Sequence, residues 1–583
     1  MKKLIVIFLV AVSFQLFQKH VWAAETNTSS PEPNLQVPII SDVHINENLP
    51  VRQEHFTNAL QDYLQIAPHY QAIVVDGDLT DYGTETQYEI FKRIFDANTV
   101  PDAAKLLVMG NHEFYKGTYA NSQNSDQMLI DRFVTETGAD GLYYDKWIKG
   151  SNQENYHFIV LSSEVSSATA PEDYTVLSDQ QYQWLENTLK QDANPNKPIF
   201  VFIHEPIANT VYGSEEWGSQ LLTGRLKSIL QQYPQAILFT GHLHYLLNHP
   251  RSVYQDGFTM VSTGAVAYML YEGGNAPMEF SQGLLVNVYD DHVEIKAREF
   301  SNHSWVNQYS IPIPFRKTID DTEKPSFPAD AQATVTGVTA TTASISWPAA
   351  TDNTMVDKYV IKQNGKVLQT VYNKYWESPS ASPYTANLSN LSANTNYSLE
   401  ISAVDAWNNE SANSIFVGLK TDLSKGWVKA GTIYFYYDER TGQKVTGWLL
   451  DKDKWYYFNK YGMMQTGWVN VNGKWYLLGT DGAMKTGWAK DNGSWYYLDQ
   501  NGAMKIGWVI VGQRWYFLKS SGAMQSGWLH DSGSSYYLNS SGVMQTGWKL
   551  IVNKWYYFYS SGKMAVNTKI GNCKIGSDGV WIR

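Results

Sequence analysis

The sequence predicts three folded regions in series: an α/β sandwich (αββα), then a β-sandwich, then a solenoid of repeated β-hairpins. Apolar strand-length runs alternate with amphipathic helical stretches over residues 37–316, which is typical of an α/β layered fold. Residues 325–422 contain short alternating strands separated by turn residues, as in a β-sandwich. From residue 426 onward a Gly-Trp pair recurs at a nearly fixed interval, which indicates a repeat architecture.

Length, charge and cysteine content restrict the class of protein. At 583 residues the chain is too long for one hydrophobic core. Residues 426–583 carry 18 basic and 9 acidic side chains, so the net charge of -11 leaves -20 on residues 1–425. The acidic N-terminal part, residues 1–425, argues against nucleic-acid wrapping, and the basic, aromatic C-terminal part indicates an anionic partner. Cys573 is the only cysteine, so no intrachain disulfide can form and stability must come from cores or bound metal.

The N-terminus has the features of a secretory signal peptide. Lys2 and Lys3 precede an apolar run over residues 4–12, and Ala23 ends a small-residue cleavage site. The apolar run is shorter than the roughly 20 residues of a spanning helix, which favours cleavage over the alternative of an uncleaved membrane anchor. We therefore expect a signal peptide at 1–23, a polar linker at 24–36, and a secreted chain with no membrane-spanning segment after cleavage.

Possible metal ligands follow apolar runs at five places in the first domain. The run Ala72–Val75, for example, stops at Gly77 and Asp78. Because strand carboxyl ends meet at one edge of an α/β sheet, the side chains that follow them are expected to gather there. Asp, His and Asn without cysteine suit Zn, Mn, Fe or Ni, and a carboxylate can bridge two such ions. The polar residues at these five ends are Asp42, His44, Asp78, Asn111, His112, Glu113, His204, His242 and His244.

A glycine precedes a ligand at three of these ends. Gly77, Gly110 and Gly241 stand directly before Asp78, Asn111 and His242. We expect each glycine to permit a tight turn that leaves the next side chain pointing outward.

The five motifs together resemble the motif set of the calcineurin-like metallophosphoesterases, in the family's order over residues 37–250. The resemblance implies two divalent metal ions (Mn, Zn or Fe). It implies that one ion is held by Asp42, His44, Asp78 and His244, and the other by Asp78, Asn111, His204 and His242. The implied reaction is hydrolysis of a phosphomonoester or phosphodiester substrate by a hydroxide that bridges the ions.

Three further residues take their expected roles from the same resemblance. His112 is expected to face the substrate phosphate and assist the leaving group, with Glu113 orienting it through a hydrogen bond. Asp81 stands where purple acid phosphatases have a tyrosine that binds ferric iron, so that subgroup is not expected. The role of Asp81 itself is left open.

The middle region is expected to connect the two ends of the chain. Residues 317–324 form a charged hinge that ends at a proline. Trp347 and the turn that leads to Tyr397 resemble a fibronectin type III module over 325–422, with Tyr397 as the tyrosine-corner residue. Nothing in this module resembles a catalytic motif, and we expect it to be a spacer.

The C-terminal region, residues 426–583, repeats one short unit. After a first interval of 21 residues every Gly-Trp interval is 20, and each unit is too short to bury its own apolar face. The unit, Gly-Trp followed by a Trp-Tyr-Tyr-type hairpin and a small turn, resembles the choline-binding repeats of Gram-positive surface proteins, and glucan-binding repeats are similar. The repeated tryptophans are Trp427, Trp448, Trp468, Trp488, Trp508, Trp528 and Trp548.

Choline suits such a surface because a quaternary ammonium donates no hydrogen bond and is best held by aromatic faces. The resemblance implies cages formed by adjacent repeats, of which the first is Trp448, Trp455 and Tyr476 and the second is Trp468, Trp475 and Tyr496. Further cage residues are Trp488, Trp495, Trp508, Trp515 and Tyr516. Ser535 replaces an expected tryptophan, so the site at that hairpin should be impaired. The alternative is that these aromatics only form the core of the solenoid.

The combined prediction is a secreted, cell-wall-associated phosphoesterase held on choline-bearing teichoic acids or similar wall polymers. A non-catalytic surface adhesin is the competing class, and a glucan-binding tail is the alternative to choline. The retention of all five motifs favours the enzyme.

Overall fold

The structure is a computed structural model that describes residues 32–115, 125–166, 175–191, 194–377 and 382–582. The expected signal peptide and most of the expected linker before the first domain lie outside these residues. The chain forms two compact units, each described by itself. The first contains residues up to 334 with 346–386 and 398–417, and the second contains 335–345, 387–397 and 418–583. Among the described residues, no helix is both long and apolar enough to cross a membrane.

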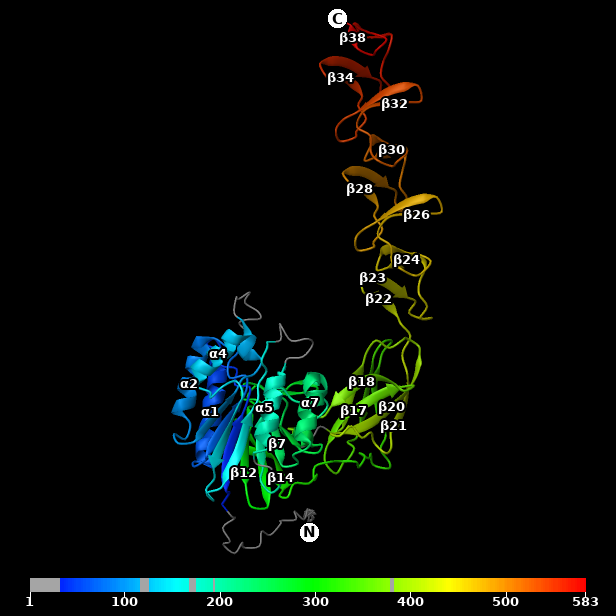
Figure 1. The fold of residues 1–583 in the computed structure, drawn as a ribbon. Coiled ribbons are helices and arrows are strands. Elements are labelled where there is room, and N and C mark those ends of the chain that lie inside the picture. The colour runs from blue at the N-terminus through cyan, green and yellow to red at the C-terminus, as the bar shows by residue number, and fades with distance from the viewer. Residues whose placement is uncertain (1–31, 116–124, 167–174, 192–193, 378–381, 583) are drawn as a thin grey trace, which may run out of the picture. The chain divides into compact units, whose positions relative to one another are not determined.

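The first domain contains two six-stranded sheets (Figure 1). The first sheet has the order β14 (Ser304–Pro312), β13 (His292–Glu299), β12 (Gln282–Val288), β1 (Leu35–Ile40), β2 (Ala72–Asp76) and β3 (Ala104–Val108). The second has the order β4 (Tyr144–Lys149), β5 (Asn155–Val160), β6 (Ile199–Phe202), β7 (Ala236–Thr240), β9 (Thr259–Ser262) and β8 (Val253–Gln255). Strand β1 already starts two residues inside the expected linker.

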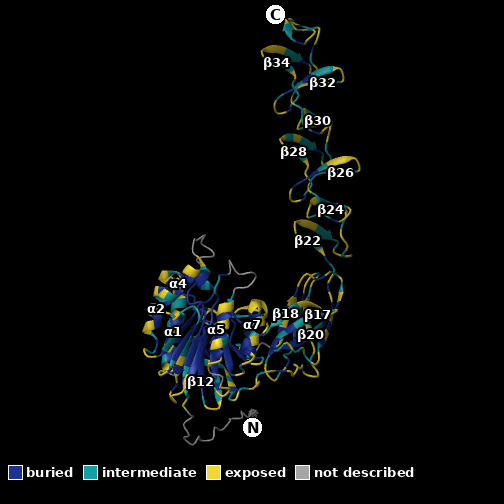
Figure 2. Cartoon of the chain, viewed as in Figure 1, coloured by how far each residue is buried: buried dark blue, intermediate teal, exposed yellow. Residues whose placement is uncertain are grey.

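Helices cover the outer face of each sheet and complete the predicted αββα sandwich. The first sheet packs on α1 (Pro50–Ile66), α2 (Glu85–Ala97) and α4 (Asp126–Thr137), and the second on α5 (Asp179–Leu189) and α7 (Gln220–Leu230). A third core lies between the sheets and contains side chains such as Val37, Phe158 and Phe239. The strands are accordingly the most deeply buried part of this domain (Figure 2).

Two local features of this domain follow directly from its sequence. Ser178 caps α5, because its hydroxyl accepts a hydrogen bond from the backbone N–H of Gln181. Strands β12 and β13 form an antiparallel hairpin around Asp290 and Asp291.

The sheet topology brings the motif-bearing strand ends together. Strands β1, β2 and β3 run parallel to one another, and β6 runs parallel to β7. All five strands are followed directly by the polar motifs, so these motifs converge on the carboxyl edges of the two facing sheets.

The middle region has the strands of the predicted β-sandwich. One sheet has the order β15 (Thr334–Val338), β16 (Ala343–Trp347) and β19 (Tyr384–Leu388), and the other β18 (Lys366–Tyr372), β17 (Val356–Gln363), β20 (Asn396–Asp405) and β21 (Ile415–Lys420). Trp347 is buried, with its ring centroid 5.6 Å from that of Tyr359 on the opposite sheet. The hydroxyl of Tyr397 accepts a hydrogen bond of 2.7 Å from the N–H of Ser392, as expected of a tyrosine corner.

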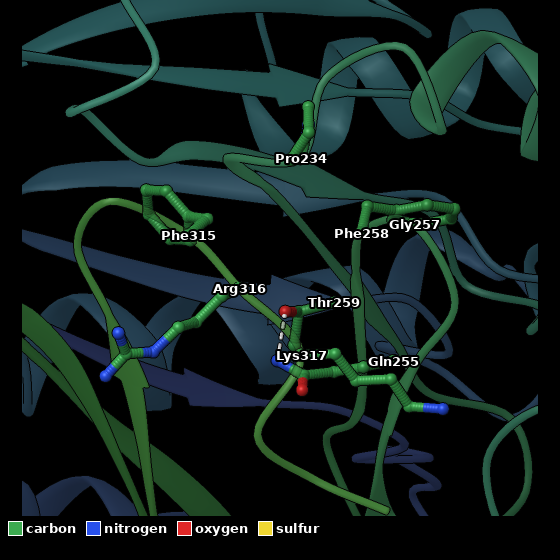
Figure 3. Close-up of a pocket in the computed structure, with 8 residues that line it drawn as sticks. All are labelled: Pro234, Gln255, Gly257, Phe258, Thr259, Phe315, Arg316 and Lys317. Atoms are coloured by element: carbon green, nitrogen blue, oxygen red, sulfur yellow. Dashed lines mark hydrogen bonds between the residues drawn. The ribbon is translucent and has the colours of Figure 1, made fainter.

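The linker before this module is fastened to the first domain by Gln255. Its side-chain oxygen accepts hydrogen bonds from the N–H groups of Thr318 and Ile319 at 2.8 and 3.0 Å. A small cavity of about 70 Å³ lies beside this contact (Figure 3). None of the residues that line it is a predicted metal ligand, so it is separate from the strand-end motifs.

The tail consists of β-hairpins that follow one another along the chain. In each hairpin the Gly-Trp pair opens the first strand and the Trp-Tyr-Tyr-type segment forms the second, so one repeat is one hairpin. The hairpins are β22–β23 (Gly426–Ala430, Ile433–Tyr437), β24–β25 (Gly447–Asp451, Lys454–Phe458), β26–β27 (Gly467–Val471, Lys474–Leu478), β28–β29 (Gly487–Asp491, Ser494–Leu498), β30–β31 (Gly507–Val511, Arg514–Leu518), β32–β33 (Gly527–Asp531, Ser534–Leu538) and β34–β35 (Gly547–Ile551, Lys554–Phe558). The repeat solenoid is therefore confirmed.

Candidate metal centre and aromatic cages

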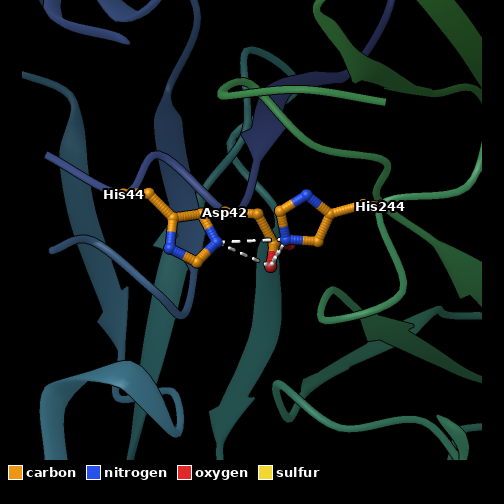
Figure 4. Close-up of side chains that lie close together, drawn as sticks. All are labelled: Asp42, His44 and His244. Carbon is orange, nitrogen blue, oxygen red and sulfur yellow. Dashed lines mark hydrogen bonds and ion pairs between the residues drawn. The ribbon is translucent and has the colours of Figure 1, made fainter. Parts of the chain in front are cut away.

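The predicted metal ligands of the first domain lie within contact distance of one another. His244 Nε2 lies 3.1 Å from Asp42 Oδ1 and 3.0 Å from His44 Nε2 (Figure 4). On the neighbouring side, His204 Nε2 lies 3.1 Å from Asp78 Oδ2. His242 Nδ1 lies 3.1 Å from Asn111 Oδ1.

Asp78 stands between the two halves of this cluster. The ligand atoms of Asp78, His204 and His242 lie within 4.8 Å of one another, as do those of Asp42, His44 and His244. Two further contacts link the halves: Asp78 Oδ2 lies 3.7 Å from His44 Nε2, and Asp42 Oδ1 lies 3.8 Å from His204 Nε2. This geometry agrees with a shared carboxylate between two cation positions.

Several buried ligand atoms lie close to other ligand atoms but form no hydrogen bond of regular geometry among the described residues. They include Asp42 Oδ1 and His204 Nε2, both in fully buried side chains. Leaving such polar atoms without a partner costs about 1–3 kcal/mol each. Since both atoms point into a cluster of imidazole and carboxylate donors, the residues present fit a pair of divalent cations.

The three glycines before the ligands act in two different ways, which amends the prediction. Gly77 has a φ of +87°, so it does form the expected left-handed turn. Gly110 and Gly241 do not have a positive φ. Glycine is needed at these two positions because a Cβ would clash with neighbouring atoms. A Cβ on Gly110 would lie 2.3 Å from Asp78 Oδ1, and one on Gly241 would lie 2.0 Å from Ser41 Oγ and 2.7 Å from Asp42 Oδ2.

The ligand residues themselves carry unusual backbone conformations. Five of them have positive φ values between 48° and 68°, a region that non-glycine residues rarely occupy. Each such residue costs of order 1–3 kcal/mol and persists only where its surroundings impose it. The five are Asp42, His44, Asp78, His242 and His244.

The charges of the cluster are strongly coupled. Against the effect of burial, His244 and His204 hold the pKa of Asp42 well below its usual range. Burial also acts against protonation of His44, yet hydrogen bonds with Asp42 and Asp81 raise its pKa to about 9. Burial and the neighbouring His204 instead lower the pKa of His242 to about 3, so the carboxylates favour positive charge at His44 while His242 is held neutral.

Outer residues hold the ligand side chains in orientation. His204 Nδ1 lies 2.7 Å from the Asp76 carbonyl, and His244 Nδ1 lies 3.0 Å from the Tyr268 carbonyl. His44 Nδ1 lies 3.4 Å from Asp81 Oδ1. Such partners fix which ring nitrogen is left for a metal.

Asp81, whose role the sequence left open, is placed by this arrangement behind His44. Its carboxylate is held by Arg52 Nη1 at 2.8 Å and by the side-chain amide of Asn46 at 2.8 Å. It thus connects helix α1, which carries Arg52, to a ligand of the cluster. The only indication of this role in the sequence was that Asp81 lies three residues after Asp78.

His112 lies at the rim of the cluster, and the hydrogen bond from Glu113 that was expected to orient it is not formed. His112 Nε2 is 3.9 Å from Asp78 Oδ2, and its Nδ1 is 3.1 Å from the Asp81 carbonyl, which takes the orienting role. The Glu113 carboxylate is fully buried and accepts hydrogen bonds from the N–H groups of Thr80 and Gly110, both at 2.9 Å. Glu113 therefore ties the loop after β2 to the loop after β3, since both loops leave N–H groups that need a buried acceptor.

Tyr268 is a neighbour of the cluster that the sequence did not indicate. Its ring centroid lies 4.2 Å from that of His244, and 38% of the residue is exposed. Tyr268 lies outside every motif, so the sequence did not predict this placement.

In the tail, the first predicted cage is an open pocket of about 280 Å³. Trp448 meets Tyr476 of the next repeat with ring centroids 4.9 Å apart and Trp455 of its own hairpin at 6.3 Å. Met484 also lines the pocket. Trp455 is 42% exposed, so this ring is only partly covered by the solenoid.

The same contact recurs along the tail. The Gly-Trp ring meets the tyrosine of the following hairpin at 4.8 Å in the pairs Trp468–Tyr496, Trp488–Tyr516, Trp508–Tyr536 and Trp528–Tyr556. Hairpin tryptophans Trp475, Trp495 and Trp515 remain exposed by 43–45% beside them. Tyr536 and Tyr556 were not among the predicted cage residues, although they occupy the repeat position of Tyr516.

An αββα sandwich with a shared-carboxylate cluster of Asp, His and Asn at its strand ends defines the class of two-metal phosphoesterase folds. Residues 35–246 match the family model of the calcineurin-like phosphoesterases, and residues 325–417 match that of the fibronectin type III domain. The choline-binding repeat model matches 465–506 and 526–568, and a cell wall binding repeat model matches 446–462 and 506–524. The chain thus joins a calcineurin-like phosphoesterase domain, a fibronectin type III domain and choline-binding repeats, and the predicted families are confirmed.

Known proteins resemble different parts of the chain. A probable glycerophosphodiester phosphodiesterase GpdQ of Arcobacter nitrofigilis is 25% identical over 218 residues, which cover 35% of this chain and 70% of that protein. A 3',5'-cyclic-nucleotide phosphodiesterase of Nostoc is 23% identical over 222 residues, covering 36% and 73%. The solved structure of choline binding protein F from Streptococcus pneumoniae shares 31% identity over 41% of this chain and 76% of that chain, with a TM-score of 0.27.

Proposed function

We propose that this protein is a secreted, wall-associated phosphoesterase with two divalent metal ions, held on choline-bearing polymers by its tail. The observation that carries the enzymatic part is the convergence of Asp42, His44 and His244 with Asp78, His204 and His242 around one shared carboxylate. A binding protein would have no need for this set of strained, buried donors.

The two ions would be held as the motif pattern predicts. Asp42, His44, Asp78 and His244 would hold one, and Asp78, Asn111, His204 and His242 the other. When bound, such a pair supplies positive charge for phosphoryl oxygens and activates water as a nucleophile. Mn, Zn and Fe all suit these ligands, because imidazole, amide and carboxylate donors accept each of them.

His112 would bind the phosphoryl group and assist the leaving oxygen. Its Nδ1 is engaged with the Asp81 carbonyl, so Nε2 is the nitrogen available toward the cluster. Burial lowers the pKa of His112 to about 4 in the free protein, so the ring enters neutral at physiological pH. An anionic phosphoryl group next to Nε2 would raise that pKa and favour the protonated ring, which can then donate to the leaving oxygen.

The substrate class proposed is a phosphodiester. Two relatives of the first domain are named as a probable glycerophosphodiester phosphodiesterase and a 3',5'-cyclic-nucleotide phosphodiesterase, while a third is named as a probable purple acid phosphatase. Choline-bearing teichoic acids contain phosphodiesters and would lie beside an enzyme anchored on their choline groups. Phosphomonoesters, including those of nucleotides, are the alternative that the experiment below separates.

The tail is proposed to bind choline rather than glucan. The three rings around the pocket at Trp448 offer π faces to a cation, and such aromatic cages are suited to quaternary ammonium groups. Retention of the full chain on a choline-type resin with elution by free choline supports this proposal. Retention on dextran with no release by choline would contradict it.

Hydrolysis of bis-p-nitrophenyl phosphate and p-nitrophenyl phosphate in the presence of Mn²⁺ or Zn²⁺ tests the enzyme. We expect turnover of the diester that is lost on chelation and lost in the Asp78→Asn variant. Absence of turnover of both esters with either metal would contradict the phosphoesterase.

A further inference from the structure

Residues 346–386 and 398–417 of the fibronectin type III module belong to the same compact unit as the first domain and contact it there. Trp376, which follows β18, places its ring against Tyr271 with centroids 4.7 Å apart at 78°. Lys358 of β17 pairs with Glu272 at 3.0 Å. Tyr375 and Trp376 also pack on a buried apolar cluster of the first domain formed by Leu246, Ala265, Met269 and Ala276. Residues 265–276 are therefore a main contact of the module on the first domain, beside further contacts such as His249 with Asp357 at 3.6 Å.

Segment 265–276 also holds the metal ligands from the other side. Its Tyr268 carbonyl lies 3.0 Å from Nδ1 of His244, and its Leu270 N–H donates to the His244 carbonyl at 2.7 Å. The Ala267 N–H donates to the Asp42 carbonyl at 3.0 Å. Asp42 and His244 are both ligands of the same predicted ion, and their side chains face each other (Figure 4).

We infer that the fibronectin type III module is a structural part of the metal centre, and that Trp376 is a positioning residue for His244 and Asp42. The module was expected to be a spacer from its sequence. Its contacts instead make residues 265–276 a layer with the module on one side and the ligands on the other. The inference rests on the proposed function, because it concerns the residues that would hold the metal.

The physical argument follows from what segment 265–276 contains. It has two short strands, β10 (Leu270–Tyr271) and β11 (Gly274–Asn275), which pair with each other, and outside this pair Leu270 forms a single parallel bridge with Tyr245. A two-stranded pair is marginally stable without further packing. The aromatic and apolar contacts of Tyr375 and Trp376 supply that packing, and a ring of this size dominates the energetics of an interface. Without it, the carbonyl that orients the His244 ring would move.

The test compares full-length Trp376→Ala with the parent protein by Mn²⁺ binding. We expect one of the two ions to bind roughly tenfold more weakly, as is typical when the outer support of a ligand is removed. For bis-p-nitrophenyl phosphate, kcat should fall with little change in KM. Amide exchange should become faster in residues 265–276. Trp376→Phe should restore most of each property, because it keeps a ring at the contact.

Phe416→Ala is the matched control, since Phe416 is 69% exposed on β21 of the same module. It should leave metal binding, kcat and exchange unchanged. Unaltered Mn²⁺ affinity and unaltered exchange of 265–276 in Trp376→Ala would overturn the inference. A parent protein that binds two ions but hydrolyses neither nitrophenyl ester would contradict the proposed function alone, because the metal-binding and exchange comparisons would still be valid.

Discussion

The metal centre and the aromatic cages of this chain are assembled in opposite ways. The metal centre gathers carboxylate, imidazole and amide side chains from five strand ends that lie between residues 42 and 244. The cages use one pattern of rings, in which a Gly-Trp ring meets a tyrosine of the next hairpin at nearly the same distance each time. The first site depends on the whole domain being folded, whereas a cage needs only neighbouring repeats.

This difference predicts different responses to damage. A shared ligand such as Asp78 has no substitute, so its loss should abolish the site. A cage is one of several similar sites, and binding through several sites on one chain falls only gradually as single sites are lost. The predictions below are ordered from the largest expected effect to the smallest.

Asp78→Ala should have the largest effect. Removal of the carboxylate shared by both ion positions should empty or disorder both, with a loss of turnover of about a thousandfold or more, since both ions act on the same phosphoryl group. Elemental analysis and assay of bis-p-nitrophenyl phosphate measure this. Asp102→Ala, at an exposed position of the same domain, is the control. Two retained ions in Asp78→Ala would contradict the shared-ligand assignment.

His112→Ala should keep both ions and lose about 10²–10⁴-fold in turnover, the usual contribution of a positioned proton donor. His112 is partly exposed at the rim, so its removal leaves the buried ligands in place. Metal content and kcat of the purified variant distinguish a proton donor from a metal ligand. If the variant loses an ion, His112 is a ligand and its assigned role is wrong.

Chelation should lower the thermal stability of the first domain without affecting the tail. Ligand binding at about 100 times its Kd stabilises a fold by about 2.7 kcal/mol, which corresponds to a few degrees in Tm for a domain of this size. Calorimetry before and after EDTA should show one shifted transition. A shift in every transition would indicate that the chelator acts elsewhere.

Among single tail variants, Trp508→Ala should weaken retention on a choline resin only moderately. It removes the ring that meets Tyr536 at 4.8 Å and leaves the other cages intact. The choline concentration that elutes the protein should fall a few-fold, because one of several linked sites is lost. Complete loss of retention would show that one cage dominates, which would break the comparison drawn above.

Ser535→Trp should have the smallest effect, and in the opposite direction. Trp528 and Tyr556 already lie 4.8 Å apart beside Ser535, so a tryptophan there would complete a cage. Elution should require more choline than for the parent. An unchanged elution profile would mean that the hairpin ring adds nothing to choline binding.

The sequence predicted the convergence of ligands better than it predicted their support. Strand ends followed by Asp, His or Asn imply a common edge in any α/β sheet, so the convergence of these side chains could be predicted without a structure. The support depends on contacts between distant segments. Glu113 accepts hydrogen bonds from the backbone N–H groups of Thr80 and Gly110, because these buried groups need a carboxylate acceptor. The carbonyl of Asp81 contacts His112 in the place that was expected for Glu113. The contact of Trp376 with Tyr271 spans more than a hundred residues and carries no motif.

In the tail, too, the sequence predicted the positions of side chains better than their contacts. The repeat interval placed the predicted rings correctly in register, because every hairpin is built alike. It did not indicate that the indole N–H groups of Trp427, Trp468 and Trp508 donate to Asp451, Asp491 and Asp531. These aspartates occur in alternate repeats, so the contact pattern has a period of two hairpins. This two-hairpin period arises from single residues at the strand ends, so the Gly-Trp spacing does not reveal it.

The left-handed backbone of five ligand residues has a consequence for the supply of active protein. At of order 1–3 kcal/mol each, these conformations together approach the whole stability of a typical domain. Bound cations would offset that strain, so the fraction of molecules that complete their folding should follow the free metal concentration where the chain matures. Scarcity of metal would then reduce the yield of intact enzyme, and supplementing the ion after synthesis would recover only the molecules that had escaped degradation.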